Sequence, residues 1–256
     1  MSSKGFENVQ DAVVRMRSLV TVAKSLDNVE MHLVLNSEVL RAMTCTYRAA
    51  ASAMTRYRDT LWWQLDAEMG RVVASLAVLQ GSREVPDRLE LAQHQWLSAS
   101  DNVGVLARRI ERMESNDTGW SGRARSGKSR AVERQRVATG EFAETLQGLG
   151  RVTRQGQLLM ESVFSTAALS VSSGNAQLSG FVHRAPSVSV GMWGLFSRSS
   201  GAVVRVRATA GFLATHVSGG APWRAAASGL RSEVEELMAD GDELTPGGWP
   251  RPVARA

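Results

Sequence analysis

Apolar side chains recur every three or four residues along most of the chain, and this spacing predicts long amphipathic helices. The predicted helices cover about 5–26, 37–79, 87–115 and 121–168. None of the four segments contains a proline, so each can continue as one helix. The pattern therefore favours a mainly α protein, built as an elongated bundle of long antiparallel helices.

The most regular pattern lies in the third predicted helix. Its apolar and small residues alternate at spacings of three and four: Leu89, Ala92, Trp96, Ala99, Val103, Leu106, Ile110 and Met113. We call this row the 89–113 seam, and a seam of this kind packs lengthwise against another helix. A second stripe begins after Gly122, and the turn-forming residues 115–119 separate the two. Two amphipathic helices joined by a short turn predict an antiparallel hairpin.

Several residues mark where the helices are expected to stop. Asp27 and Asn28 favour caps and turns, so the first helix is expected to end there. Gly81 and Pro86 end the second helix, because glycine closes helices readily and proline cannot continue one. Within the second helix, Trp62 and its neighbour point about 100° apart, so only one of the two can face a given partner helix.

The composition changes after about residue 170, where Ser, Gly and Val dominate. Residues 202–209 alternate in a way that fits either a strand or a helix of small residues, and 222–238 predict a final helix. We therefore expect a less regular C-terminal third.

These changes divide the chain into four predicted parts. An N-terminal helical pair occupies 1–84, and a helical hairpin packed on it occupies 85–169. A Gly/Ser/Ala-rich C-terminal region with a final helix covers 170–241, and a disordered, proline-rich tail covers 242–256.

The chain carries 30 Lys and Arg against 25 Asp and Glu, a net charge of +5. Such an excess suits nucleic acid or anionic surfaces, and it also arises in an Arg- and Ala-rich composition without any such partner. A single cysteine excludes an internal disulfide and a Cys-rich zinc site, and the four histidines are scattered. We expect no metal, no cofactor and no catalytic site, and hence a protein that is not an enzyme.

One stretch matches the phosphate-loop pattern G-x-x-x-x-G-K-[ST], from Gly122 to Ser129. A phosphate loop follows a buried strand, whose end delivers backbone N–H groups to the phosphates. The residues before Gly122 are polar and turn-like, and no apolar strand closed by Asp is found elsewhere. The match is therefore interpreted as a chance one, and nucleotide binding is disfavoured.

The same stretch begins a basic cluster. Six cations face one acid, Glu133, in residues 123–136: Arg123, Arg125, Lys128, Arg130, Arg134 and Arg136. The first five are possible phosphate contacts. No aromatic residues are interleaved for base stacking, so a solvated helix face is favoured and nucleic acid is an unlikely partner.

Residues about 87–165 combine two predicted helices with a turn, Trp120-Ser121-Gly122, between them. This arrangement resembles the Trp-x-Gly family of small type VII secretion substrates. The resemblance implies a non-enzymatic hairpin that pairs with a second one, with Trp120 and Gly122 shaping the turn and a surface that the export machinery recognises. The Tyr-x-x-x-Asp/Glu export signal of the family is missing from this sequence.

The resulting expectation is a type VII-like helical protein that acts through helix–helix assembly, by self-association or with a protein partner. Two alternatives stay open. The segment 170–220, with Met192-Trp193-Gly194-Leu195-Phe196, could insert into a membrane as part of a pore-forming protein. The basic cluster at 123–136 could bind nucleic acid.

Two further features bear on location. No run of about 20 apolar residues exists to span a bilayer, and the first residues lack the basic start and apolar core of a secretory signal. The protein is therefore expected to be secreted without a cleaved signal peptide, or cytoplasmic.

Overall fold

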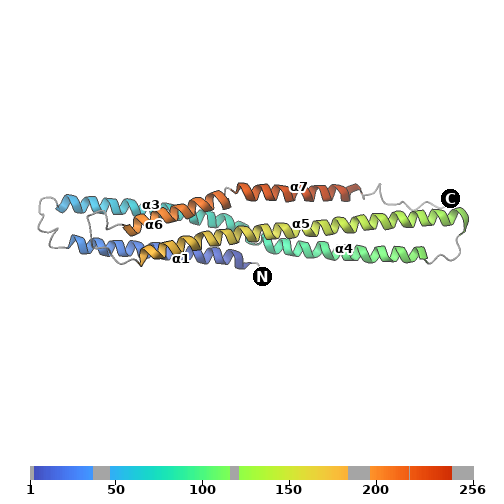
Figure 1. The fold of residues 1–256 in the computed structure, drawn as a ribbon, viewed down its shortest axis with the longest axis horizontal. Coiled ribbons are helices and arrows are strands. Elements are labelled where there is room, and N and C mark those ends of the chain that lie inside the picture. The colour runs from blue at the N-terminus through green and yellow to red at the C-terminus, as the bar shows by residue number, and fades with distance from the viewer. Residues whose placement is uncertain (1–2, 37–46, 116–120, 184–196, 219, 244–256) are drawn as a thin grey trace. The chain divides into compact units, whose positions relative to one another are not determined.

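The computed structural model describes residues 3–36, 47–115, 121–183, 197–218 and 220–243. Within these ranges nearly all residues are helical and none forms a strand, which confirms the prediction of an α protein (Figure 1). The elements are α1 (Ser3–Leu35), α3 (Tyr47–Gly81), α4 (Val85–Ser115), α5 (Gly122–Val182), α6 (Ser197–Leu213), the π-helix η1 (Ala214–Ser218) and α7 (Ala221–Glu243). Four of these helices exceed 30 residues: α1, α3, α4 and α5.

The helices form two compact units. Unit 1 comprises residues 1–84 and 161–223, and unit 2 comprises 85–160 and 224–256. Helix α5 contributes residues 161–182 to unit 1 and residues 122–160 to unit 2, and nearly all of α7 belongs to unit 2. The division of the chain into four successive domains stays a prediction.

Unit 1 packs α1, α3, α6 and the end of α5 around one apolar core. Helix α3 runs antiparallel to α1, since Lys24 pairs with Asp66 at 2.7 Å and Asn28 accepts a hydrogen bond from Arg58. The Phe6 ring of α1 meets the Phe164 ring of α5 edge-on, with ring centroids 6.3 Å apart. These contacts bury Phe164 together with Met16, Leu65 and Leu178, and burial of such side chains stabilises the unit by roughly 2 kcal/mol each.

Unit 2 consists of α4, the first half of α5 and α7. Helix α4 runs antiparallel to α5, because Leu89 lies against Gly156, Leu97 against Gly150, and Ser100 Oγ donates to the Ala143 carbonyl at 3.1 Å. The predicted hairpin therefore matches the structure in the direction of its two helices. Helix α7 is also antiparallel to α5, as Leu230 lies near Gly156 and Leu237 near Gly148.

The first helix does not end at Asp27 and Asn28, as predicted, but continues to Leu35. Asp27 accepts hydrogen bonds from Ser199, and Asn28 accepts one from Arg58. Tertiary partners thus occupy the side chains that would otherwise compete with the helix backbone. The helix is retained because these partners lie on α3 and α6.

The expectation of a less regular C-terminal third is wrong for the described residues. Helix α5 runs through the Ser- and Gly-rich stretch to Val182, and residues 202–209 belong to α6 rather than to a strand. Asn175, on α5, donates to the Ala12 carbonyl at 2.8 Å, and Gly174 lies between Met16 and Thr209. Tertiary contacts to α1 and α6 therefore hold as a helix a segment whose own propensity is weak.

The break between α3 and α4 agrees with the prediction. α3 ends at Gly81, and the amides of Ser82 and Arg83 bond back to Leu79 and Gln80. Pro86 lies in the first turn of α4, where its missing N–H costs nothing.

Glycine at 174 should be required, whereas glycine at 180 should not. A Cβ at 174 would lie 2.6 Å from Thr209 Oγ1 and 2.8 Å from Met16 Cε, while a Cβ at 180 would meet nothing within 4 Å. Gly174→Ala should lower the free energy of unfolding by about 1–2 kcal/mol, because overpacking outweighs the gain in helix propensity. Gly180→Ala, the matched control, should raise it by about 0.5–1 kcal/mol. Urea titration of both variants measures the difference, and equal effects would contradict the packing argument.

Candidate interaction surface

The turn residues that the sequence singled out are only partly described. Trp120 lies outside the described residues, whereas Gly122 is the first residue of α5 and has φ of 63°. Other residues adopt this left-handed conformation at a cost of about 1–2 kcal/mol. A glycine is therefore favoured where the chain enters α5.

The phosphate-loop match does not form a loop. Residues 122–129 are the first two turns of α5, and Ser126 Oγ donates to the Gly122 carbonyl at 3.5 Å. A phosphate loop needs several consecutive backbone N–H groups that converge on one point, which a regular helix does not provide beyond its first turn. The geometry agrees with interpreting the match as chance.

The five possible phosphate contacts share the first four turns of α5. Arg123, Arg125, Arg130 and Arg134 are exposed, and Lys128 is half-buried. Arg130 and Arg134 donate to backbone carbonyls one turn earlier, at 3.2 and 3.3 Å, which places both along the helix axis. Glu133 forms an ion pair with Arg136 at 2.6 Å, and this neighbour lowers the pKa of the Glu133 carboxyl. The structure thus gathers these cations on one helix end, which has no acidic residue in its first turn.

Apolar side chains are exposed at the same end of unit 2. Six residues of α7 follow Leu237, about 9 Å of helix, so α7 ends level with about residue 142 of α5 (Figure 1). At the levels that α7 reaches, Ala92 and Ala99 of the 89–113 seam are half-buried and Trp96 is 37% exposed. Further along the seam, Leu106 is 45% and Met113 is 62% exposed, whereas Ile110 between them is buried.

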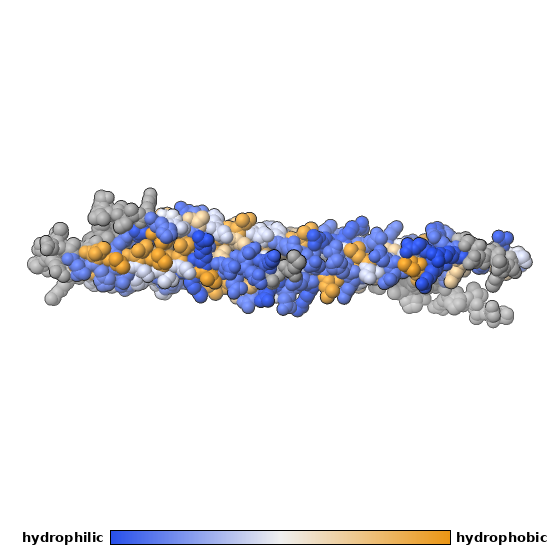
Figure 2. All heavy atoms as spheres, turned by 90° about the horizontal axis from the view of Figure 1, so that it is seen from below, coloured by the Kyte–Doolittle hydropathy of each residue, from blue (hydrophilic) through white to orange (hydrophobic). Residues whose placement is uncertain are grey.

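We call this region the open end of unit 2 and define it as residues 104–113 of α4 and 122–142 of α5. Its α5 side also exposes Val137, to 43%. On the face drawn in Figure 2, a hydrophobic patch at the right-hand end lies beside strongly hydrophilic surface. The open end therefore combines cations with apolar side chains that no described helix covers.

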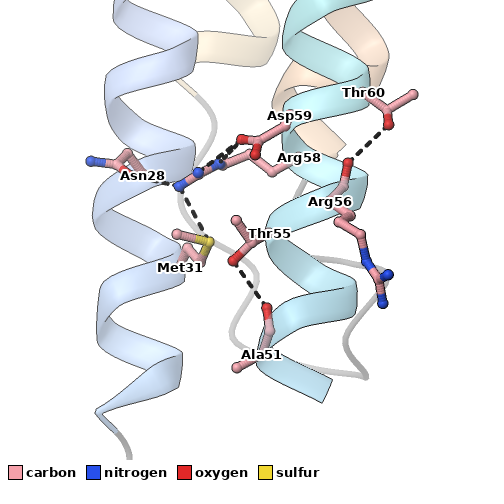
Figure 3. Close-up of polar contacts among 8 residues, drawn as sticks. All are labelled: Asn28, Met31, Ala51, Thr55, Arg56, Arg58, Asp59 and Thr60. Atoms are coloured by element: carbon pink, nitrogen blue, oxygen red, sulfur yellow. Dashed lines mark hydrogen bonds and ion pairs between the residues drawn. The ribbon is translucent and has the colours of Figure 1, made fainter. Parts of the chain in front are cut away.

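A different surface feature lies on α3, where the side chains of Trp62 and Trp63 point in different directions, as expected. Trp62 is half-buried, and its ring lies 4.6 Å from the Arg58 guanidinium and 5.8 Å from Lys24 Nζ. Arg58 also donates to Asn28 and Asp59, and it contacts the Met31 sulfur of α1 (Figure 3). Trp63 is 71% exposed. The first tryptophan thus joins α1 to α3, and the second faces away.

Unit 1 also contains a buried polar cluster that sequence reasoning missed. Asp27 is fully buried and accepts hydrogen bonds from the Ser199 amide, at 3.1 Å, and from the Ser199 hydroxyl. Beside it, Arg198 forms an ion pair with Glu30 at 2.8 Å and donates to the Phe181 and Val182 carbonyls. The cluster caps the start of α6 and the end of α5. More than 160 residues separate Asp27 from Ser199 and Glu30 from Arg198, so no local pattern indicates these two pairs.

Burial raises the pKa of the Asp27 carboxyl to about 6, even though the hydrogen bonds from Ser199 favour the ionised form. A raised pKa beside a serine invites comparison with a catalytic pair. The cluster contains no histidine, however, and two hollows found in unit 1, of about 290 and 390 Å³, do not include its residues. We therefore interpret Asp27 and Ser199 as a capping pair.

Other chemistry is limited in the part of the chain that the structure describes. No group of three or more His, Cys, Asp or Glu side chains is placed to hold a metal ion there. None of the helices described is both long and apolar enough to cross a bilayer. The segment 192–196, considered for membrane insertion, lies outside the described residues. Comparison of the chain with protein-family models, with curated proteins and with solved structures found no match.

Asp27 predicts a dependence of stability on pH. Its pKa is about 6 in the folded protein and 3.8 in its ordinary state, so the folded protein binds a proton more tightly than the unfolded chain. This contribution to stability is present below pH 4 and is lost as the pH rises through 6. The free energy of unfolding should be about 1 kcal/mol larger at pH 5 than at pH 7 from this group alone.

Urea titrations at the two pH values measure that difference. Asp27→Asn should remove it, while the exposed control Asp101→Asn should retain it. A wild-type difference that persists in Asp27→Asn would contradict the assignment. The charged groups facing Asp27 are Glu30 and Arg198, which stay unchanged in both variants.

Proposed function

We propose that this protein is a non-enzymatic helical protein that acts by assembly with another helical protein through the open end of unit 2. The observation that carries the proposal is the exposure of Leu106 and Met113, at 45% and 62%. They are the two most exposed residues of the seam, in which Trp96 is 37% exposed and the other residues are half-buried or buried. A seam repeated over eight positions serves lengthwise packing. Its uncovered part has the pattern of a helix interface without a described partner helix.

The surroundings of these two residues support the proposal. On α5, Val137 and Phe142 are 43% and 36% exposed, so both helices of the hairpin offer apolar side chains. Burying roughly 100 Å² of apolar surface contributes about 2.5 kcal/mol. Contiguous exposed apolar side chains bordered by charged ones are typical of protein interaction sites.

Export by a type VII system is the second part of the proposal, and it rests on the Trp-x-Gly resemblance. The antiparallel α4–α5 hairpin and the positive φ of Gly122 are compatible with it. The nucleic-acid alternative draws on the basic cluster, and the membrane alternative draws on a segment outside the described residues.

Replacing the exposed seam residues should weaken assembly without unfolding the protein. Leu106→Ser/Met113→Ser removes apolar surface from the open end, and the matched control Val14→Ser/Val22→Ser removes exposed apolar side chains from α1. Both variants should stay within about 1 kcal/mol of the wild type in stability, because the side chains are exposed. Only the first should lose assembly, by about tenfold or more in affinity.

A photo-crosslinking residue at position 106, with position 14 as control, measures assembly in intact cells. A discrete crosslinked species from position 106 alone is the expected result. Crosslinks of equal yield from both positions, or from neither, would reject the proposal.

Export has its own test. In an actinobacterial host with a working type VII system, the intact chain should appear in the culture filtrate and should be retained when the system is deleted. Trp120→Ala and Gly122→Ala should reduce the exported fraction, because both residues belong to the turn motif. Retention of the wild-type chain in a host with an intact system would remove this part of the proposal and leave assembly to be judged separately.

A further inference from the structure

The net charge of the chain is concentrated at the open end of unit 2. Residues 108–136 contain nine Lys or Arg and four Asp or Glu, a net +5, which equals the net charge of the whole chain. The opposite charge lies on the second half of α7. Residues 231–243 contain one Arg and six Asp or Glu, a net −5. One compact unit thus carries a strongly basic and a strongly acidic segment.

Glu233 and Glu236 of α7 lie away from the basic segment of their own unit. Leu237 lies against Gly148 of α5, and α7 ends level with about residue 142, short of the basic cluster. The acids Glu233 and Glu236 are exposed, and so is Met238, at 57%. The acidic segment therefore presents both charge and an apolar side chain to the outside.

The face of α5 that holds α7 continues into the basic segment. Val137, Arg134 and Arg130 precede Gly148 by roughly three, four and five helical turns, so they share its side of the helix. All three are exposed. A helix lying there would meet one apolar and two cationic side chains, and the two cations suit a partner helix with exposed acidic residues on one side.

We propose that this partner is a second copy of the chain, whose α7 places Glu233 and Glu236 on the open end of the first. This inference rests on the proposed function and identifies the protein that the open end of unit 2 binds. In a two-fold dimer the same contact forms twice, so each copy supplies one basic and one acidic segment. The match of +5 with −5 favours this occupant.

The chain's own tail is a poorer occupant by charge. Residues 244–256 contain two arginines, three prolines and no acid. Like charges repel, and proline prevents a regular helix. A nucleic-acid duplex would satisfy the cations but would leave Leu106, Met113 and Val137 uncovered.

A charge swap on the full chain tests the proposal. One variant carries Arg130→Glu/Arg134→Glu, and the other carries Glu233→Arg/Glu236→Arg. Each should weaken self-association at least tenfold in sedimentation at 50 mM salt, because like charges then face each other. A mixture of the two should form a dimer again, since both contacts of the heterodimer pair opposite charges. Arg15→Glu/Arg17→Glu on α1 is the matched control and should dimerise like the wild type.

Misfolding does not explain the expected loss. All four substituted side chains are exposed, so the substitutions should change the stability of each helix by less than about 1 kcal/mol. Raising the salt from 50 to 500 mM should weaken the wild-type dimer at least tenfold, because the charges are exposed. The restored dimer in the mixture is the outcome that a merely structural effect does not produce.

Four results would overturn the inference. The wild-type chain could be monomeric at low salt, or the swapped variants could each dimerise as well as the wild type. The full chain could also be monomeric while a variant ending at residue 243 dimerises, which would assign the open end to the tail. A monomeric chain that binds a DNA duplex would assign the cations to nucleic acid. In any of these cases, a crosslink from position 106 to a different protein would leave the proposed function standing.

Discussion

Close packing against the glycines of α5 is the constraint on which the rest of the structure depends. A Cβ at Gly148 would lie 2.8 Å from Leu237, and one at Gly150 would lie 3.1 Å from Leu97. In unit 1, Gly174 gives the same close approach to Met16 and Thr209. Each glycine weakens the isolated helix by up to about 1 kcal/mol. Helix α5, with 61 residues and this glycine content, is stabilised by the helices packed against it. Those helices can approach α5 closely because the same glycines have no side chain.

The buried polar groups of unit 1 act in the same way on the ends of helices. Arg198, at the start of α6, donates to the last carbonyls of α5, and Asp27 accepts the Ser199 amide. These are groups that helices leave unsatisfied at their ends. One Asp27 oxygen has no partner, and burial raises the pKa of the carboxyl to about 6. The cluster thus fixes where α5 ends and α6 begins, and its burial makes ionisation of the Asp27 carboxyl less favourable.

The sequence predicts the parts of the fold that depend on periodicity. The stripes at 87–115 and after Gly122 identify α4, α5 and their antiparallel direction, and Gly81 and Pro86 identify the break before them. It fails where distant partners override local preference. Asp27 and Asn28 favour a helix end in isolation, and the Ser- and Gly-rich residues 170–182 favour an irregular segment. Contacts with α3, α6 and α1 keep all of them helical.

The candidate site shows the same division. Its composition is visible in the sequence as a basic cluster beside an apolar seam. Its exposure is not, because it depends on where α7 ends relative to α5, and on Leu237 meeting Gly148 rather than a residue nearer the turn.

Two local rules are broken together at the open end of unit 2. Cations occupy the start of α5, where the helix dipole favours anions, and its first turn contains no acid. Large apolar side chains are exposed on α4 within the same region, although α4 has the most regular seam in the chain. Either violation alone is common on protein surfaces. Their coincidence is informative, because an acidic helix with an apolar face would relieve both at once. Sequences that are otherwise consistent with their fold tend to break local rules where they bind something, and for that reason we propose that the function lies at this end of unit 2.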